Sequence, residues 1–272
     1  MTAVALSPVH TAAELAPRLT WPRSTFLIML RELRPVVRNP FSVIFGLVQP
    51  LVFLGLFGPL LAGSLRGAGA FDEGVWQWFV PSILLMTTLF GTSTTGANLQ
   101  VEMQTGAHER LLVTPLPRSA QLVGRALKEM VPLVAQSILV IAVMLPFGFR
   151  LHVVGAAAGL ALLAVLGVGL GSLSYALAIA VRKNEWMFWV VQQTFLFPLL
   201  ILSGLLLPLD DGPRWMQVAA NVNPLAYVAE AERALFAGDL ASSVVLGGIV
   251  AAALTAAFGL AVGVRTIVRS TD

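Results

Sequence analysis

The sequence predicts an all-α integral membrane protein with six transmembrane helices. Of its 272 residues, 57% are hydrophobic and only 11% are charged, whereas a soluble domain carries about 25% charged residues. Six stretches approach or reach the roughly 20 apolar residues that cross a bilayer as a helix, and none contains Asp, Glu, Lys, Arg or His. Backbone groups in lipid must bond internally, which favours helices. The spans are expected near residues 40–62, 79–98, 131–149, 153–180, 187–207 and 243–264.

The chain divides into a short N-terminal tail and a membrane domain. Residues 1–22 contain Pro8, Glu14 and Pro17 and lack the basic start and apolar run of a signal peptide. We expect this segment to be a flexible cytoplasmic tail, and residues 23–272 to form a single transmembrane domain.

Residues 23–34 are expected to form an amphipathic helix at the membrane surface. Phe26, Leu30 and Leu33 share one face of such a helix, and two arginines lie beside that face. Pro35 is expected to end or kink the helix. An ordinary basic flank that fixes the orientation of the first span would explain the same residues.

The second span is rich in hydroxyl groups, and two roles are open for them. Thr88, Thr92, Thr95 and Asn98 are candidates for a substrate path through the membrane. Alternatively, the hydroxyls bond the backbone of their own helix or a neighbouring helix and serve packing only.

Small residues recur at helical spacing in the fourth and sixth spans. The runs are Gly155–Gly159, Gly167–Gly171 and Gly259–Gly263. A dinucleotide-binding loop is a poor explanation, because no strand precedes the glycines and no acidic ribose partner follows. The pattern predicts close helix packing instead.

The stretch 208–241 before the last span mixes apolar and charged residues. It fits two short amphipathic helices separated at Asn223-Pro224, with Trp215 in the first and Arg233 in the second. Such helices can lie in the interface or dip partly into the outer leaflet.

The charge distribution predicts the orientation of the chain. With the N-terminus in the cytoplasm, the inner segments hold 5, 4, 2 and 2 of the 17 Lys and Arg residues, and the opposite loops hold Arg66, Arg150, Arg214 and Arg233. This is the positive-inside pattern, and it places both termini in the cytoplasm. The pI of about 9.9 is therefore explained without nucleic acid as a partner.

Catalytic and metal-binding constellations are absent from the sequence. There is no cysteine, no Walker A sequence and no Gly-x-Ser-x-Gly motif, and the three histidines are far apart. The uncharged spans also disfavour a carrier coupled to protons or sodium, which commonly keeps buried ionisable residues. A transporter of this composition would need energy from elsewhere.

A polar island between the second and third spans carries a family resemblance. The run Thr105-Gly-Ala-His-Glu-Arg-Leu-Leu-Val-Thr-Pro-Leu-Pro-Arg118, followed by Leu122-Val-Gly-Arg125, resembles the membrane subunits of ABC-2 type transporters, and the DrrB-like drug-resistance permeases in particular. Ala107 stands where a threonine is usual, and Gln104-Thr105 stand where an acidic residue is usual. Further similarity lies at Arg38-Asn-Pro40, Gln49-Pro50, Asn223-Pro-Leu225 and Arg233.

The resemblance implies the ABC-2, or type V exporter, fold with six helices and two membrane subunits per transporter. It implies two copies of a separate soluble ATPase, which would hold ATP and Mg, with no cofactor bound by this chain. The implied ATPase-coupling residues are Gly106, His108, Glu109, Arg110, Leu111, Leu112, Thr114 and Pro115.

The resemblance also implies that the segment before the last span is re-entrant from outside. Trp215, Asn223, Pro224 and Arg233 are its candidate functional residues.

The expected function is that of a permease subunit, without its own ATPase motifs, that exports an amphiphilic drug-like or lipid-like substrate. The expected form is a homodimer in a bacterial plasma membrane. A lipid-linked glycan or polysaccharide is the alternative cargo. A membrane-embedded lipid-modifying enzyme is disfavoured, because no nucleophile, acid/base pair or metal cluster is visible.

Overall fold

The computed structural model describes residues 20–38, 41–64, 74–107, 116–207, 209 and 212–269, and all of its regular structure is helical. The elements are α1 (Trp21–Arg38), α2 (Phe41–Ser64), α3 (Val75–Gln104), α5 (Arg118–Met144), the 3-10 helix η1 (Leu145–Phe147), α6 (Val153–Ala180), α7 (Glu185–Ile201), α8 (Arg214–Val222), α9 (Pro224–Ala237) and α10 (Ser243–Arg269).

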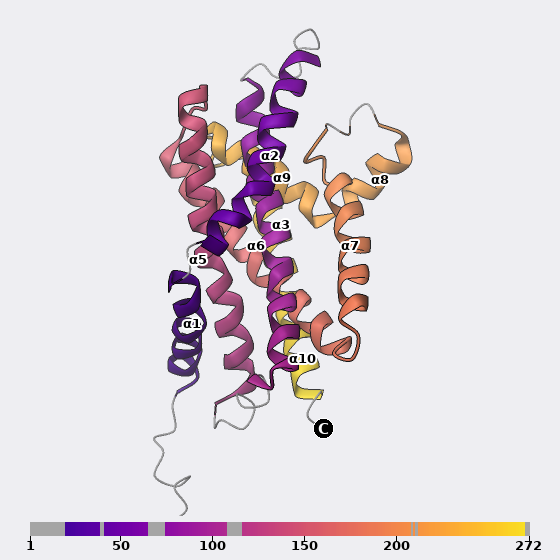
Figure 1. Cartoon of the computed structure of the whole chain (residues 1–272). Coiled ribbons are helices and arrows are strands. Elements are labelled where there is room, and N and C mark those ends of the chain that lie inside the picture. Colours follow the sequence, from indigo (N-terminus) through magenta and orange to yellow (C-terminus); the bar gives the residue numbers. More distant parts are fainter. Residues whose placement is uncertain are drawn as a thin grey trace, which may run out of the picture.

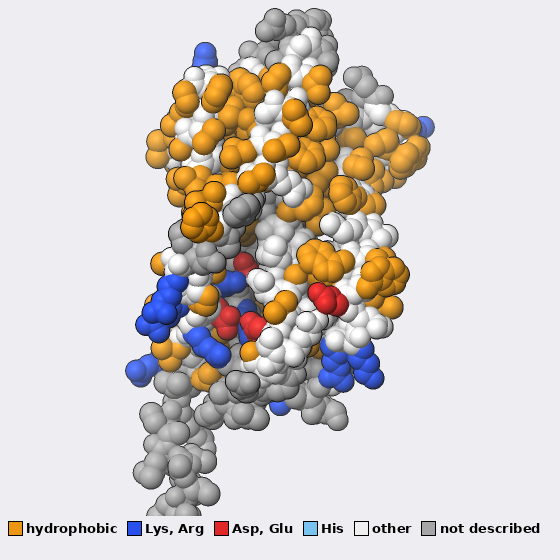
Figure 2. All heavy atoms as spheres, viewed as in Figure 1, with side chains coloured by type: hydrophobic (Ala, Val, Ile, Leu, Met, Phe, Trp, Pro, Cys, Tyr) orange, Lys and Arg blue, Asp and Glu red, His pale blue; other side chains and the backbone are white. Residues whose placement is uncertain are grey.

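The long helices form an elongated bundle (Figure 1). α1 lies beside α5 near the end that carries the C-terminus, and α8 and α9 lie toward the opposite end (Figure 1). In the view of Figure 2, hydrophobic side chains cover the part of the bundle away from α1, and most Lys and Arg side chains gather near the α1 end. The surface therefore has the apolar belt and polar end of a membrane domain.

Four helices of the described part are long and apolar enough to cross a membrane: α3, α5 with η1, α6 and α10. α7 has 17 residues, which at about 1.5 Å per residue gives roughly 25 Å and falls short of a hydrocarbon core of about 30 Å. α2 has 24 residues and no charged side chain, and Gly46–Leu61 is its apolar stretch within the described residues. The described structure thus supports a multi-pass bundle, and the count of six spans stays a prediction.

Helix ends differ from the expected span ends in both directions. α3 and α5 extend beyond their predicted apolar spans into polar flanks, so that α5 begins at Arg118 rather than near residue 131. α7 ends at Ile201, before residue 207, because Gly204 adopts a left-handed φ of 68° in the following turn. That conformation favours glycine and cannot continue a helix.

The core is centred on α3, which packs against α6 and α9, while α6 in turn packs along α10. The expectation that the glycines of α6 and α10 allow close packing is confirmed. A Cβ atom on Gly169 would lie 2.7 Å from the Cα of Ala256 and 2.7 Å from the carbonyl oxygen of Thr255. Only glycine permits this approach of the two backbones.

α1 is present where a helix was predicted but is longer, and its place at the membrane surface stays a prediction. It begins at Trp21 and continues through Pro35 to Arg38, so Pro35 does not end it. Its buried residues Ser24, Thr25 and Ile28 face α5, and this contact supports the helix over its length. Phe26 and Leu30 remain exposed on another face.

The two short helices predicted before the last span are present as α8 and α9. Asn223 separates them and caps α9, since its Oδ1 accepts a hydrogen bond from the Leu225 amide at 3.0 Å. Pro224 follows as the first residue of α9, where the missing N–H costs nothing. Leu225, Val228 and Phe236 of α9 are buried, whereas α8 has no buried residue.

Candidate functional site

A cavity of about 540 Å³ lies among α2, α3, α5 and α7, and we call it the mixed cavity. Its aromatic wall contains Phe90 and Phe197, whose rings meet edge to face with centroids 6.4 Å apart, and Trp189. Its polar lining residues are Gln49, Thr87, Ser93, Thr94, Asn98, Lys128, Glu129, Gln136 and Gln193. Pockets that combine apolar walls with a few polar groups are typical of small-molecule sites.

The hydroxyls of α3 that face the mixed cavity are already committed as donors. Thr87 donates to the carbonyl oxygen of Ile83 at 2.8 Å, Ser93 to Leu89 at 2.9 Å and Thr94 to Gly91 at 2.6 Å. Each oxygen keeps lone pairs that can accept a further hydrogen bond. The α3 wall therefore presents acceptors to a molecule in the cavity.

The predicted substrate-path residues of α3 divide between its two faces. Thr88 and Thr92 are buried against α6, where a Cβ on Gly167 would lie 3.6 and 3.7 Å from their methyl groups. Thr95 is buried next to Gly171. Asn98 is exposed and lines the mixed cavity.

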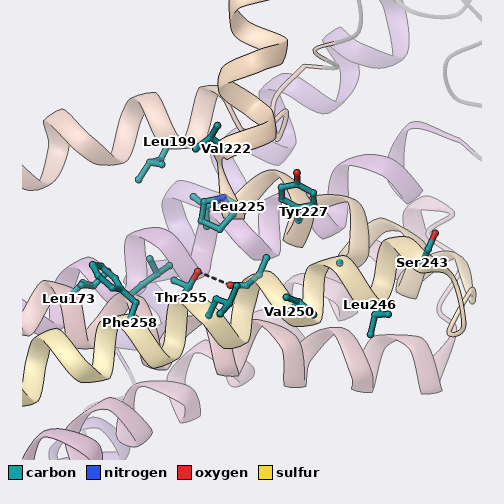
Figure 3. A pocket seen from close by; sticks show the side chains of 15 residues that line it. Leu173, Leu199, Val222, Leu225, Tyr227, Ser243, Leu246, Val250, Thr255 and Phe258 are labelled. Carbon is teal, nitrogen blue, oxygen red and sulfur yellow. Dashed lines mark hydrogen bonds between the residues drawn. The ribbon is translucent and has the colours of Figure 1, made fainter.

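A second cavity, the apolar groove, has a volume of about 850 Å³ and lies among α6, α7, α9 and α10. Figure 3 shows Leu246, Val250 and Phe258 spaced along α10, with Tyr227 of α9 next to this helix and its hydroxyl turned away from it. Thr255 donates its hydroxyl to Ala251 of its own helix at 2.8 Å. The groove consequently offers an almost wholly apolar surface.

Arg233 connects α9 to α3 and to the turn after α7. Its Nη2 donates to Ser82 Oγ at 2.9 Å and to the carbonyl oxygen of Gly204 at 2.7 Å, and its guanidinium lies 4.1 Å from the Trp78 ring centroid. No ion pair within 4 Å joins Arg233 to the exposed Glu230, so this arginine serves as a structural tie between α3, α9 and the turn after α7.

The other external candidates take different positions. Asn223 is buried and donates from Nδ2 to the carbonyl oxygen of Leu199 at 2.8 Å, while Trp215 on α8 is 66% exposed. Pro224 and Leu225 line the apolar groove.

Two residues at the α9 end of the bundle were missed by sequence reasoning. Gln77 of α3 donates from Nε2 to the carbonyl oxygens of Arg150 and Phe236, each at 2.9 Å, and accepts from the Arg150 amide at 3.1 Å. Glu232 is fully buried in α9 without a hydrogen-bond partner among the described residues. The sequence could have predicted this burial, because the helical spacing of Glu232 from Leu225 and Val228 places it on the apolar face of α9.

The predicted ATPase-coupling residues lie mostly outside the described residues. This holds for His108, Glu109, Arg110, Leu111, Leu112, Thr114 and Pro115. Gly106 is described and has a left-handed φ of 68° directly after α3, so it turns the chain away from the helix axis. Within the described ranges, no group of three His, Cys, Asp or Glu side chains comes together to hold a metal ion.

Comparison with known proteins agrees with the architecture. Residues 23–237 match the family model described as "ABC-2 type transporter". The chain is 26% identical over 238 residues to daunorubicin resistance ABC transporter permease protein DrrB1 of Streptomyces coeruleorubidus, covering 86% of this chain and 82% of the relative.

Two further relatives carry similar descriptions. The probable doxorubicin resistance ABC transporter permease protein DrrC of Mycobacterium tuberculosis is 26% identical over 248 residues, covering 89% of this chain and 88% of the relative. The probable multidrug ABC transporter permease YbhR of Escherichia coli is 25% identical over 175 residues, covering 62% of this chain and 46% of the relative. The chain therefore belongs to the ABC-2 type transporter family, as a multi-pass permease subunit of an ABC exporter that pairs with an ATPase subunit.

Proposed function

We propose that this permease exports an amphiphilic, drug-like or lipid-like compound using ATP hydrolysed by a separate subunit. The mixed cavity carries the proposal, because it combines an aromatic wall with amide and hydroxyl groups within the membrane bundle. A molecule with an apolar ring system and several hydrogen-bonding groups is complementary to that lining. The drug names in the descriptions of the DrrB1 and DrrC relatives support the same class of cargo.

The apolar groove favours a second type of cargo. Its volume of about 850 Å³ and its lack of charged lining residues suit a long hydrocarbon chain rather than a compact drug. A lipid-linked glycan or polysaccharide, with its lipid in the groove and its sugar outside, is therefore the alternative substrate.

The proposed assembly is a homodimer of this chain with two ATPase subunits in the plasma membrane of a bacterium, with both termini in the cytoplasm. The gathering of Lys and Arg at the α1 end supports this orientation. The end of α3 at Gln104 and the start of α5 at Arg118 lie at that same end (Figure 1), which supports a contact of the intervening segment with a cytoplasmic ATPase. ATP and Mg would be held by the ATPase subunit.

Export is tested by ATP-dependent uptake of a fluorescent anthracycline into inside-out vesicles that contain the permease with its ATPase. Asn98→Ala and Gln193→Ala each remove an amide from the cavity wall. Loss of one hydrogen bond to the cargo is expected to weaken apparent affinity roughly twofold to tenfold. Thr88→Val, on the face packed against α6, is the matched control and should leave affinity unchanged.

Uptake that persists without ATP, or that Thr88→Val reduces more than both amide variants, would contradict this assignment. If the vesicles accumulate no amphiphilic drug but move a lipid-linked saccharide, the alternative cargo is correct.

A further inference from the structure

An ion pair closes the base of the loop that connects α3 to α5. Glu102 lies in the last turn of α3, and Arg125 lies two turns into α5. Nη2 of Arg125 donates to Oε2 of Glu102 at 2.5 Å. The two ends of the loop are thus joined by a charged contact, which is stronger than a neutral hydrogen bond.

The same guanidinium contacts two further helices. Oε1 of Glu32, on α1, lies 3.7 Å from Nη2 of Arg125. The ring of Tyr175, on α6, lies with its centroid 5.6 Å from the guanidinium carbon. Arg125 is only 7% exposed. One buried cation therefore connects side chains from α1, α3 and α6.

α1 is seated directly on α5 beside this cluster. The indole N–H of Trp21 donates to Ser119 Oγ at 3.0 Å. A Cβ on Gly124 would lie 2.7 Å from the carbonyl oxygen of Thr25 and 3.0 Å from the Ile28 side chain. Such close contact leaves no room for α1 to slide, so a displacement of the start of α5 displaces α1.

The charges of the cluster are unequal in number. Two carboxylates share one guanidinium, and Nε of Arg125 has no hydrogen-bond partner. The nearby Lys128 and Glu129 form an ion pair with each other at 2.8 Å and so add no net charge beside Arg125. Removing Arg125 would leave the partly buried carboxylates of Glu32 and Glu102, which are 18% and 27% exposed, without their shared cation, which is unfavourable.

We propose that Arg125 is a positioning residue that joins the two ends of the 105–117 loop and α1 into one unit, which moves when the ATPase displaces the loop. This role rests on the proposed function, because it presupposes that an ATPase acts on the loop. The Glu102 contact keeps the loop ends together, and the Glu32 contact extends the movement to the surface helix.

The test measures substrate transported per ATP hydrolysed in the reconstituted permease–ATPase complex. Arg125→Gln is expected to lower this ratio roughly tenfold, within the range of mutations that act on coupling between sites, while ATP hydrolysis persists. Exchanging the charges in Arg125→Glu/Glu102→Arg should restore part of the ratio. Arg182→Gln is the control, because Arg182 is an exposed arginine in the turn between α6 and α7.

A second readout needs no substrate. The chain has no cysteine, so Leu30→Cys on the exposed face of α1 can carry a single fluorophore. A non-hydrolysable ATP analogue bound to the ATPase should shift its emission, and Arg125→Gln should abolish that shift. A shift that depends on Arg125, without any transport, would support the positioning role and count against the proposed export function.

An unchanged transport ratio and an unchanged emission shift in Arg125→Gln would overturn the positioning role. If Arg125→Gln does not assemble with the ATPase, the double variant Arg125→Glu/Glu102→Arg is tested instead. If this double variant assembles but transports no more substrate per ATP hydrolysed, Arg125 has a purely structural role and the proposal is wrong. If neither assembles, Glu32→Gln decides, because it keeps the Arg125–Glu102 pair. A ratio that Glu32→Gln leaves unchanged overturns the link to α1.

Discussion

At the scale of single residues, Glu232 is held under unusual conditions. Its carboxyl group is fully buried, and a Cβ placed on Gly159 of α6 would lie 2.7 Å from its Oε2. Burial raises the pKa of the Glu232 carboxyl to about 8. The folded protein therefore favours the protonated, neutral form of this side chain.

The raised pKa predicts that stability falls as the solution becomes alkaline. A carboxyl group whose folded pKa lies above its unfolded value of 4.5 stabilises the protein fully below pH 4.5, and this contribution is lost as the pH rises through about 8. The slope within that window is at most about 1.4 kcal/mol per pH unit. Thermal unfolding of the purified protein in detergent, followed from pH 5 to pH 9, measures it.

Glu232→Gln should remove this part of the pH dependence, because an amide does not titrate. Glu230→Gln is the matched control, since Glu230 is exposed on the same helix. Equal pH dependence in the wild type and Glu232→Gln would show that the carboxyl does not set the alkaline stability.

At the scale of helices, apolar runs predicted where helices lie better than where they end. Residues 153–180 were predicted to the residue as α6, because both flanks change abruptly in composition. α5 begins well before its apolar run, since Gln121, Arg125 and Glu129 are buried by α1 and α3 rather than exposed to water. A single sequence carries no sign of those neighbours.

The sequence also did not show which face of α3 lines the cavity and which packs against α6. Hydroxyl residues occur all around this helix, so helical periodicity did not distinguish the packed Thr88 from the cavity-lining Thr94. The Arg125 cluster draws on segments 23 to 93 residues apart, and no local motif shows such a meeting. The two short helices α8 and α9 were predictable because Asn223-Pro224 is a local signal.

The contact of α6 with α10 gives a prediction about packing. Gly169→Ala places a methyl group 2.7 Å from backbone atoms of α10, which must then move apart. Such overpacking costs about 1–3 kcal/mol, so the unfolding temperature in detergent should fall.

Gly55→Ala is the control for that measurement. Nothing lies within 4 Å of the added methyl group there, and Ala favours a helix over Gly by about 1 kcal/mol. If both substitutions lower the unfolding temperature equally, close packing of α6 on α10 does not limit stability.

At the scale of the whole molecule, the charge distribution predicts the orientation in the membrane. Asp239, in the turn between α9 and α10, and Lys183, in the turn between α6 and α7, are both exposed and lie at opposite ends of bundle helices. The cysteine-free chain allows single cysteines at these positions to be labelled in intact cells.

Asp239→Cys is expected to react with a membrane-impermeant maleimide from outside, and Lys183→Cys only after the membrane is opened. The reverse labelling would invert the orientation and place the loop between α3 and α5 outside, away from any cytoplasmic ATPase.

The hydrogen bonds of Gln77 bear on which helices can move at the α8–α9 end of the bundle. They fasten the start of α3, the loop at Arg150 and the last turn of α9 at Phe236 into one corner, to which His152 adds a bond to Phe236 at 3.0 Å. α8 has no buried residue and is connected to this corner at Asn223. We therefore expect α8 to move more easily than α9 when this end of the bundle changes shape.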